Sequence, residues 1–357
     1  MEKTLKNKYM KQAFNLAKKG EGFVNPNPLV GAVIVKDGRV IGKGYHKAYG
    51  MVHAEVDAIN NATEDVAGST MFVTLEPCTH FGKQPPCAHM LVEKKIKSVY
   101  IANLDPNPIV YKQGVQILEN AGIKVEYGLL DTLGASLNDI FFHYITTKRP
   151  FVAMKYAMTL DGKLATKDYD SKWITNEKSR KYVHDLRNKY RAILAGVNTI
   201  IKDDAKLNVR RHKKSRNPIR IILDPKLETP KDAYVVKTAI EQPTWIVTQK
   251  YDQAFVDLGV RLIQMDQIDL NKLLDILGDE KIDSLFVEGG AFTHAAFLEA
   301  GLVNKVYAFI GPKIIGGKHA LTPVSGEGIA LMKDALQLKD IKIKTFDEDI
   351  LITGYIK

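Results

Sequence analysis

The first 145 residues alternate between helical and extended patterns of apolar positions. Between Thr4 and Lys19 the apolar residues recur at the spacing of an amphipathic helix, and Gly20 is a suitable terminator. Residues 29–46 contain two runs of small and β-branched residues joined at Asp37-Gly38, a dipeptide that favours hairpin turns. The pattern then predicts strands at 70–75, 98–102 and 123–127, and helices from about 53 and near 87–94, 113–120 and 131–144. This alternation predicts a layered α/β domain.

The pattern resets at Thr147-Lys148-Arg149-Pro150, where charge and proline precede a new apolar strand. A second alternation follows, and residues 202–218 form a polar stretch that we expect to be a long, functional loop. We therefore predict one domain over 1–147 and another α/β domain over 148–357. The second is expected to have strands at 151–158, 192–195, 219–223, 244–247, 284–288 and 305–310, and helices near 177–188 and 291–300.

Length and composition agree with two soluble globular domains. The chain has 357 residues, of which 45% are hydrophobic and 26% charged, and a typical domain has roughly 150 residues. No apolar run reaches the roughly 18 residues that a membrane span needs, and the lysine-rich start lacks the apolar stretch of a signal peptide. We therefore expect a cytoplasmic protein with no membrane partner.

Positive charge is concentrated in the second half of the chain. The net charge is +10, and residues 147–216 alone hold 19 basic and seven acidic side chains. Such a surplus attracts phosphorylated ligands or nucleic acid, and a solvated loop explains part of it equally well.

The two cysteines of the chain, Cys78 and Cys87, combine with His53 into a potential metal site. In a reducing compartment such a pair more often binds metal than forms a disulfide. Zinc accepts one imidazole and two thiolates, and three protein ligands leave a fourth position open for water. Glu55 lies two residues after His53 and could move a proton between that water and a leaving amine, which is hydrolytic deamination. Taken singly, each residue could instead be a core histidine, a solvated carboxylate or an inert thiol.

The arrangement H-x-E with P-C is the signature of zinc nucleobase deaminases, which usually have two residues between their cysteines. Here eight residues separate Cys78 from Cys87. The segment TLEPCTHFGKQPPC, with NPNPLVG at 25–31, resembles the deaminase domain of bifunctional riboflavin biosynthesis proteins. The resemblance implies a cytidine-deaminase-like three-layer fold, zinc on His53, Cys78 and Cys87, and Glu55 as the proton carrier. It also implies substrate contacts from Asn27, His46, His80 and Lys83.

Motifs of the second half resemble the reductase domain that follows the deaminase in the same proteins. They are MKYAMTLDGK at 154–163, SKWIT at 171–175, AGVNTI at 195–200, DDAKLNVR at 203–210 and FVEGG at 286–290. The resemblance implies a fold similar to dihydrofolate reductase and NADPH binding without the G-x-G-x-x-G fingerprint, which is absent from the sequence. The glycines before the helix at 291 also suit a phosphate on physical grounds.

The resemblance assigns two sets of residues in this domain. Those expected at NADPH are Ala157, Trp173, Thr199, Asp203, Gly290, Ala291, Phe292, Thr293, His294, Ala295 and Ala296. Those expected at the substrate are Ser171, Arg187, Leu207, Arg210 and Glu288. Arginine suits the substrate's phosphate because its planar fork donates two hydrogen bonds, although Arg187 and Arg210 could also be ion-pair partners.

The predicted function is zinc-dependent deamination of 2,5-diamino-6-(5-phosphoribosylamino)pyrimidin-4-one followed by NADPH-dependent reduction of its ribosyl group to ribityl. The expected partners are this small phosphorylated pyrimidine and a second copy of the chain, with dimers and tetramers equally open, and no nucleic acid. One alternative is an RNA-editing zinc deaminase with a basic RNA-binding second half. Another is a non-catalytic zinc module, which leaves Glu55 and the open coordination position without a purpose.

Overall fold

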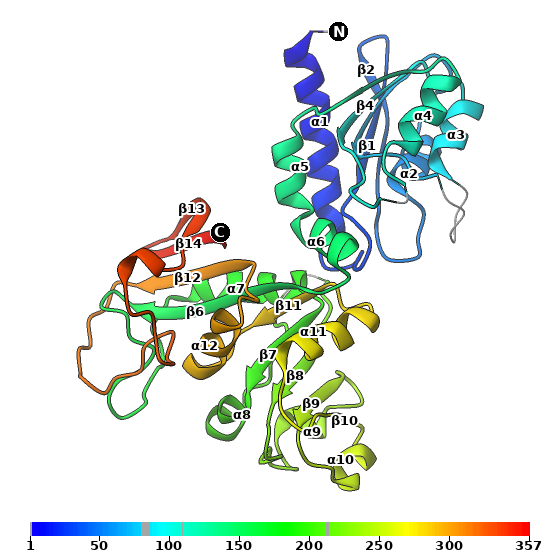
Figure 1. Ribbon diagram of the computed structural model, residues 1–357. Helices are drawn as coiled ribbons and strands as arrows, with labels where there is room; N and C mark the ends of the chain where they lie inside the picture. The colour runs from blue at the N-terminus through cyan, green and yellow to red at the C-terminus, as the bar shows by residue number, and fades with distance from the viewer. Residues whose placement is uncertain (1, 80–85, 109, 212–213) are drawn as a thin grey trace. The chain divides into compact units, whose positions relative to one another are not determined.

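The computed structural model describes residues 2–79, 86–108, 110–211 and 214–357. The chain forms two compact units, Met1–Lys148 and Arg149–Lys357 (Figure 1). The division lies at the charged, proline-containing stretch where the apolar pattern resets. No helix of the described ranges is both long and apolar enough to cross a membrane.

Unit 1 is built on a five-stranded sheet in the order β2-β1-β3-β4-β5. The strand β1 is antiparallel to β2 and to β3, whereas β3, β4 and β5 are parallel. Asp37 and Gly38 both have positive φ, of 48° and 76°, as the expected hairpin turn between β1 and β2 requires. The strands are β1 (Gly31–Lys36), β2 (Arg39–Tyr45), β3 (Thr70–Leu75), β4 (Ser98–Asn103) and β5 (Lys124–Tyr127).

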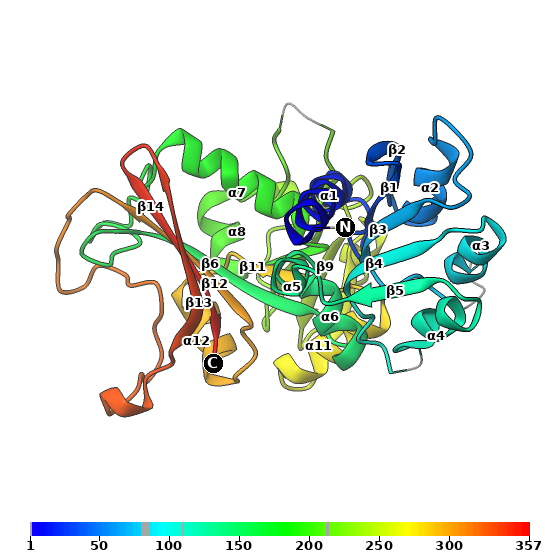
Figure 2. The same cartoon turned by 90° about the horizontal axis from the view of Figure 1, so that it is seen from above.

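Helices cover both faces of this sheet because its strands alternate apolar side chains between two cores. Val33 and Phe72 pack with Phe14 of the first helix on one face, while Ile34 and Met71 pack in the other core. Figure 2 shows α1 and α5 on one side of the sheet and α3 and α4 on the other. The helices are α1 (Lys3–Ala17), the 3-10 turn η1 (Lys18–Gly20), α2 (Ala54–Asn60), α3 (Cys87–Glu93), α4 (Gln113–Asn120), α5 (Asp131–Leu137) and α6 (Asp139–Thr147).

The single helix expected over 131–144 is wrong, because the chain breaks between α5 and α6 at Asn138. The Asn138 side chain is 3% exposed and makes hydrogen bonds to the backbone of Leu29. Its Nδ2 donates to the Leu29 carbonyl at 3.0 Å, and its Oδ1 accepts from the Leu29 N–H at 2.8 Å. A tertiary contact therefore sets this break and ties the loop before β1 to the start of α6.

Unit 2 contains a nine-stranded sheet in the order β10-β9-β8-β7-β11-β6-β12-β14-β13. The first seven strands in this order are parallel, and the last two form an antiparallel hairpin at one edge. The strands are β6 (Phe151–Thr159), β7 (Ala192–Gly196), β8 (Ile219–Leu223), β9 (Thr244–Thr248), β10 (Arg261–Gln264), β11 (Ser284–Val287), β12 (Lys305–Gly311), β13 (Leu338–Phe346) and β14 (Asp349–Ile356).

Two helical layers bury the faces of this sheet. Leu273 and Leu277 of α11 and Phe297 of α12 join one core. On the opposite face Tyr190, directly after α7, stacks on Phe286 of β11 with ring centroids 5.0 Å apart. The helices are α7 (Glu177–Lys189), α8 (Val197–Asp203), α9 (Tyr234–Lys237), α10 (Gln253–Asp257), α11 (Leu270–Asp279), α12 (Ala291–Glu299) and the 3-10 turn η2 (Met332–Asp334).

Candidate active sites

The side chains of His53, Cys78 and Cys87 meet in unit 1. His53 directly precedes α2, Cys78 follows β3, and Cys87 begins α3. The His53 Nδ1 lies 3.4 Å from Cys78 Sγ and 3.3 Å from Cys87 Sγ, and the three ligand atoms all lie within 4.8 Å of one another. Zinc bonds of about 2.3 Å to sulfur and 2.0 Å to nitrogen give a tetrahedron whose N–S edges are about 3.5 Å. Both N–S separations therefore match those expected around one zinc ion.

The charges of the two thiols also favour a cation. The hydrogen bond from Cys87, opposed by burial and reinforced by His53, lowers the pKa of the Cys78 thiol to about 4. The same hydrogen bond, together with burial, raises the pKa of Cys87. The protein alone therefore stabilises one thiolate, and a divalent cation would be needed to hold both.

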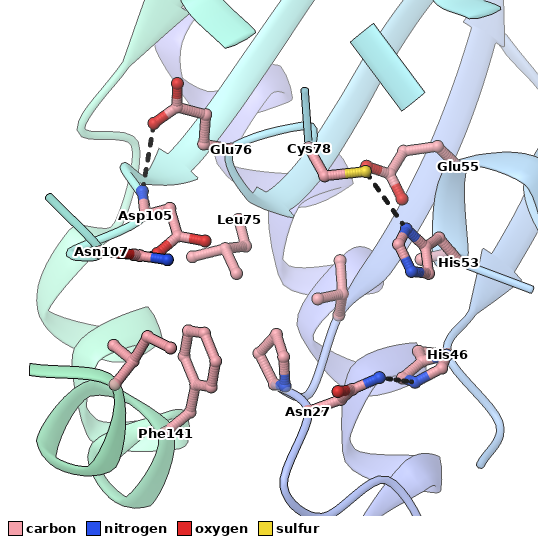
Figure 3. Close-up of a pocket in the computed structure, with 14 residues that line it drawn as sticks. Asn27, His46, His53, Glu55, Leu75, Glu76, Cys78, Asp105, Asn107 and Phe141 are labelled. Carbon is pink, nitrogen blue, oxygen red and sulfur yellow. Dashed lines mark hydrogen bonds between the residues drawn. The ribbon is translucent and has the colours of Figure 1, made fainter. Parts of the chain in front are cut away.

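Glu55 lies in the first turn of α2, and its side chain is 3% exposed. Burial and the charge of Cys78 raise the pKa of its carboxyl to about 7. Figure 3 shows this carboxyl beside Cys78 and His53. A carboxyl with a pKa near neutrality can both accept and return a proton, as a general acid and base must.

A pocket of about 230 Å³ opens beside this cluster, and Asn27 and His46 line it. The His46 Nδ1 lies 3.0 Å from the Val52 carbonyl, which can only accept, so Nδ1 carries the proton. The His46 Nε2 then accepts from Asn27 Nδ2 at 3.1 Å. This leaves the Asn27 Oδ1 directed into the pocket, where it can accept from a ring N–H or amine (Figure 3).

Sequence reasoning missed the opposite wall of the pocket. Asp105 and Asn107 follow β4, and Phe141 and Ile145 come from α6. A polar pair after a parallel strand was an available signal, because ligands bind at the carboxyl ends of such strands. The predicted substrate residues His80 and Lys83 lie outside the described residues.

In unit 2, Arg187 of α7 and Glu288, directly after β11, form a buried ion pair. Their side chains are 14% and 7% exposed. The guanidinium donates from Nε to Oε1 at 2.8 Å and from Nη2 to Oε2 at 2.7 Å, and Nη1 donates to the Asn208 carbonyl at 3.0 Å. Burial disfavours the Glu288 charge, but attraction and hydrogen bonds from Arg187, with Lys155, outweigh it and hold the pKa at about 2.

Lys155 is a third charged side chain beside Arg187 and Glu288, and no role was predicted for it from the sequence. It lies in the middle of β6, the strand beside β11. Burial lowers the pKa of its ammonium group, opposed by Glu288. The neighbouring His184 of α7 is neutral at pH 7, because burial and the charges of Arg187 and Arg210 lower its pKa to about 4. One face of the sheet therefore brings together an anion and two cations.

Comparisons with known proteins cover both units. The model of the RibD C-terminal domain matches residues 150–352, and that of the cytidine and deoxycytidylate deaminase zinc-binding region matches residues 3–103. The riboflavin biosynthesis protein RibD of Actinobacillus pleuropneumoniae is 47% identical over 353 residues, covering 96% of this chain and 93% of that protein. The chain belongs to the RibD family.

Solved RibD structures extend this agreement to the fold. Form 1 of Acinetobacter baumannii RibD is 37% identical, with a TM-score of 0.91 over 100% of both chains. The diaminohydroxyphosphoribosylaminopyrimidine deaminase/5-amino-6-(5-phosphoribosylamino)uracil reductase of Thermotoga maritima is 39% identical, with a TM-score of 0.90 over 99% of both. The predicted fold class is confirmed, with a cytidine-deaminase-like domain first and an α/β reductase domain second. The chain is a bifunctional RibD enzyme with zinc and NADPH as cofactors, and these matches give no support to RNA editing.

The start of α12 in this RibD chain has the close packing expected of a phosphate-binding turn. Gly290 is the N-cap, and the first amides of the helix have no side-chain cap. A Cβ on Gly289 would lie 2.6 Å from Thr293 Cβ, and one on Gly196 would lie 2.9 Å from Thr293 Oγ1. Both strand ends therefore need glycine to approach the helix.

The side chains of this turn do not all point the same way. Thr293, His294 and Ala295 are buried, and His294 Nδ1 donates to the Pro323 carbonyl at 2.8 Å. Phe292 is 74% exposed. The side chains of Thr293, His294 and Ala295 therefore lie in the interior of unit 2.

The remaining predicted residues lie on several elements of unit 2. Ala157 is on β6, Thr199 and Asp203 are on α8, and Ser171 and Trp173 precede α7 in an exposed segment. Arg180 lies over the Trp173 ring at 4.3 Å. After α8, Leu207 is 3% exposed, and the backbone N–H of Arg210 donates to His184 Nδ1 at 3.2 Å.

Proposed function

We propose that unit 1 hydrolyses the amine of 2,5-diamino-6-(5-phosphoribosylamino)pyrimidin-4-one and that unit 2 reduces the resulting ribosyl group to ribityl. The observation that carries the proposal is the pocket in which Glu55 lies beside a complete zinc ligand set. The Thermotoga maritima relative, named for both activities, supports the order of the two reactions.

For deamination, zinc supplies a Lewis acid that activates water toward an amine-bearing ring carbon. Glu55 carries the protons of the water, one to the neighbouring ring nitrogen and one to the amine, so that the amine leaves as ammonia and the ring carbon becomes a carbonyl. Asn27 orients the ring through its Oδ1, and His46 acts through Asn27, whose amide it holds in place. Phe141 and Ile145 provide an apolar wall against which a planar heterocycle can pack.

For reduction, NADPH supplies a hydride for the anomeric carbon of the sugar. The Lys155 ammonium and the Glu288 carboxylate can orient the hydroxyl groups of the opening sugar by charge-assisted hydrogen bonds. Lys155 gives up a proton more readily than an exposed lysine because burial lowers its pKa. Three donors of Arg187 are used within the protein, which leaves two N–H groups and Arg210 for the phosphate.

We propose the following roles for the individual site residues. His53, Cys78 and Cys87 would hold zinc, and the thiolates need a reducing compartment, consistent with a cytoplasmic location that cell fractionation would test. Contacts to NADPH are proposed for Ala157, Trp173, Thr199, Asp203 and the 290–296 turn, and contacts to the substrate for Ser171, Arg187, Leu207, Arg210 and Glu288.

Mass spectrometry of the products tests the whole proposal. Purified protein is incubated with the diaminopyrimidine ribosyl phosphate, with and without NADPH. We expect exchange of one amine for a carbonyl oxygen without NADPH, and a further gain of two hydrogens only with it. A zinc-loaded protein that produces neither change would contradict the substrate assignment.

We further propose that the chain forms a homo-oligomer through β13. This strand is at one edge of the sheet, and Ile341 and Ile343 are 57% and 68% exposed. Edge strands with exposed apolar side chains readily pair with another chain.

Sedimentation should show that the wild type is a dimer or a larger assembly and that Ile343→Lys dissociates it. The control is Ile240→Lys, at a side chain that is 83% exposed elsewhere in the unit, and this variant should leave the assembly intact. A monomeric wild type would refute the proposal.

A further inference from the structure

Glu76 is a buried carboxylate whose charge is balanced by backbone amides. It follows β3 directly, two residues before Cys78, and is 6% exposed. Its Oε2 accepts from the N–H groups of Asp105 and Lys112, both at 3.2 Å. Its Oε1 accepts from Gly114 at 3.0 Å and Val115 at 3.4 Å. Because burying a carboxylate is costly unless its oxygens are hydrogen-bonded, this site needs all four donors.

One of these donors, Asp105, belongs to the far wall of the deaminase pocket, and the other three belong to the start of α4. Asp105 and Asn107 line the pocket, and the Asp105 Oδ1 also accepts from the Asn107 N–H at 2.9 Å. Figure 3 shows the hydrogen bond from Asp105 to Glu76, with Asn107 beside it. The position of both wall residues therefore depends on an oxygen of Glu76.

The same carboxylate caps α4. The N-cap of this helix, Lys112, makes no side-chain cap hydrogen bond, and Glu76 satisfies the free amides in its place. The start of α4 also packs tightly against the chain before Cys78, since a Cβ on Gly114 would lie 2.2 Å from the Pro77 carbonyl oxygen. Residues 76–78, which include the proposed metal ligand Cys78, therefore pack against the start of α4 and are hydrogen-bonded to Asp105 of the opposite wall.

We propose that Glu76 is a positioning residue for deamination, which sets the distance between the metal side of the pocket and the Asp105–Asn107 wall. This rests on the proposed deaminase function of unit 1. A ring held between the two sides is bound correctly only when both are fixed. Glu76 also lines the pocket, but both of its carboxylate oxygens accept from backbone N–H groups, and it acts through these partners.

The test is Glu76→Gln, which keeps the side chain's size but puts an amide group against the N–H donors. We expect KM for deamination to rise about tenfold or more with a smaller change in kcat, since substrate orientation is lost while Glu55 and the metal set remain. Zinc should stay at one per chain and reduction should not change. Glu119→Gln, on an exposed position of the same helix, is the matched control and should leave KM unaltered.

A double-mutant cycle with Asn107→Ala separates positioning from general stability. If Glu76 acts through the wall, Glu76→Gln adds less than about twofold to KM once Asn107 is truncated. The proposal would be overturned if the KM increases of the two single variants multiplied in the double variant. It would also be overturned if Glu76→Gln left KM unchanged or lost zinc. If Glu76→Gln does not fold, Glu76→Asp replaces it, and unfolding of both would assign Glu76 to folding instead. Absence of deamination in the wild type would contradict the proposed function itself.

Discussion

Replacing Glu55 with glutamine should slow deamination by about 10²- to 10⁴-fold while zinc stays bound and NADPH-dependent reduction continues unchanged. Glutamine has the same shape but carries no exchangeable carboxyl proton. Burial and the charge of Cys78 raise the pKa of Glu55 to about 7, in the range that suits a group that both accepts and returns a proton. The measurements are ammonia release, zinc content and NADPH oxidation on the same preparation.

Cys87→Ser provides the contrasting variant, because it removes a proposed metal ligand instead of the proton carrier. Here zinc and deamination should be lost together, and reduction should persist. Full deamination in the Glu55→Gln variant would mean that Glu55 is not the proton carrier, whereas a non-catalytic zinc module predicts no deamination in the wild type or the variant. Loss of both activities from Glu55→Gln would contradict two separate sites.

The grouping of His53, Cys78 and Cys87 could be predicted from the sequence because cysteine and histidine are residue types that commonly bind zinc. Two cysteines are the whole thiol supply of the chain, and a histidine with a glutamate two residues later completes a recognisable set. The elements that carry them were also predictable, since Thr70–Leu75 is itself an apolar run that forms β3, and a helix was expected near 87–94, where α3 lies. The structure brings His53, Cys78 and Cys87 within bonding reach of one ion.

The other wall of the pocket could not be predicted in the same way. Asp105 and Asn107 are single polar residues in a loop, and their place depends on hydrogen bonds to Glu76 and on the order of strands.

Lys155 of unit 2 could have been singled out from the sequence. A charged residue inside an apolar run is costly in a parallel strand covered on both faces, so its presence there indicates a partner or a function.

Short and exposed elements were missed for a different reason. The strand β10 and helices α9 and α10 have only four or five residues, too few for a periodic pattern. In β13, Ile341 and Ile343 alternate with lysines, but both isoleucines are largely exposed in the isolated chain, so the strand buries no apolar face there. Its identity as a strand comes from pairing with β14.

Glu288→Gln should have the largest effect in unit 2, because it removes one partner of a buried ion pair. Arg187 and Lys155 would be left as buried cations with no counter-charge. Breaking such a pair typically costs about 3–5 kcal/mol, and we expect reduction to be lost while deamination persists. NADPH oxidation and calorimetric unfolding of the second unit measure the two effects. Glu280→Gln, in an exposed pair with Arg261, is the control and should change neither.

The effect of Glu288→Gln on stability should depend on pH with a defined sign. In the folded protein the Glu288 pKa is about 2, against 4.5 for an unperturbed carboxyl. The folded state therefore binds this proton less readily than the unfolded state, so the charge stabilises the fold fully above about pH 4.5 and progressively less toward pH 2. The difference in unfolding temperature between wild type and variant should be constant from pH 7 to pH 5 and narrow below that. A difference that widens in acid would mean that the pair does not hold Glu288 ionised, and the two Arg187 donors now directed at Glu288 would then be free to bind phosphate.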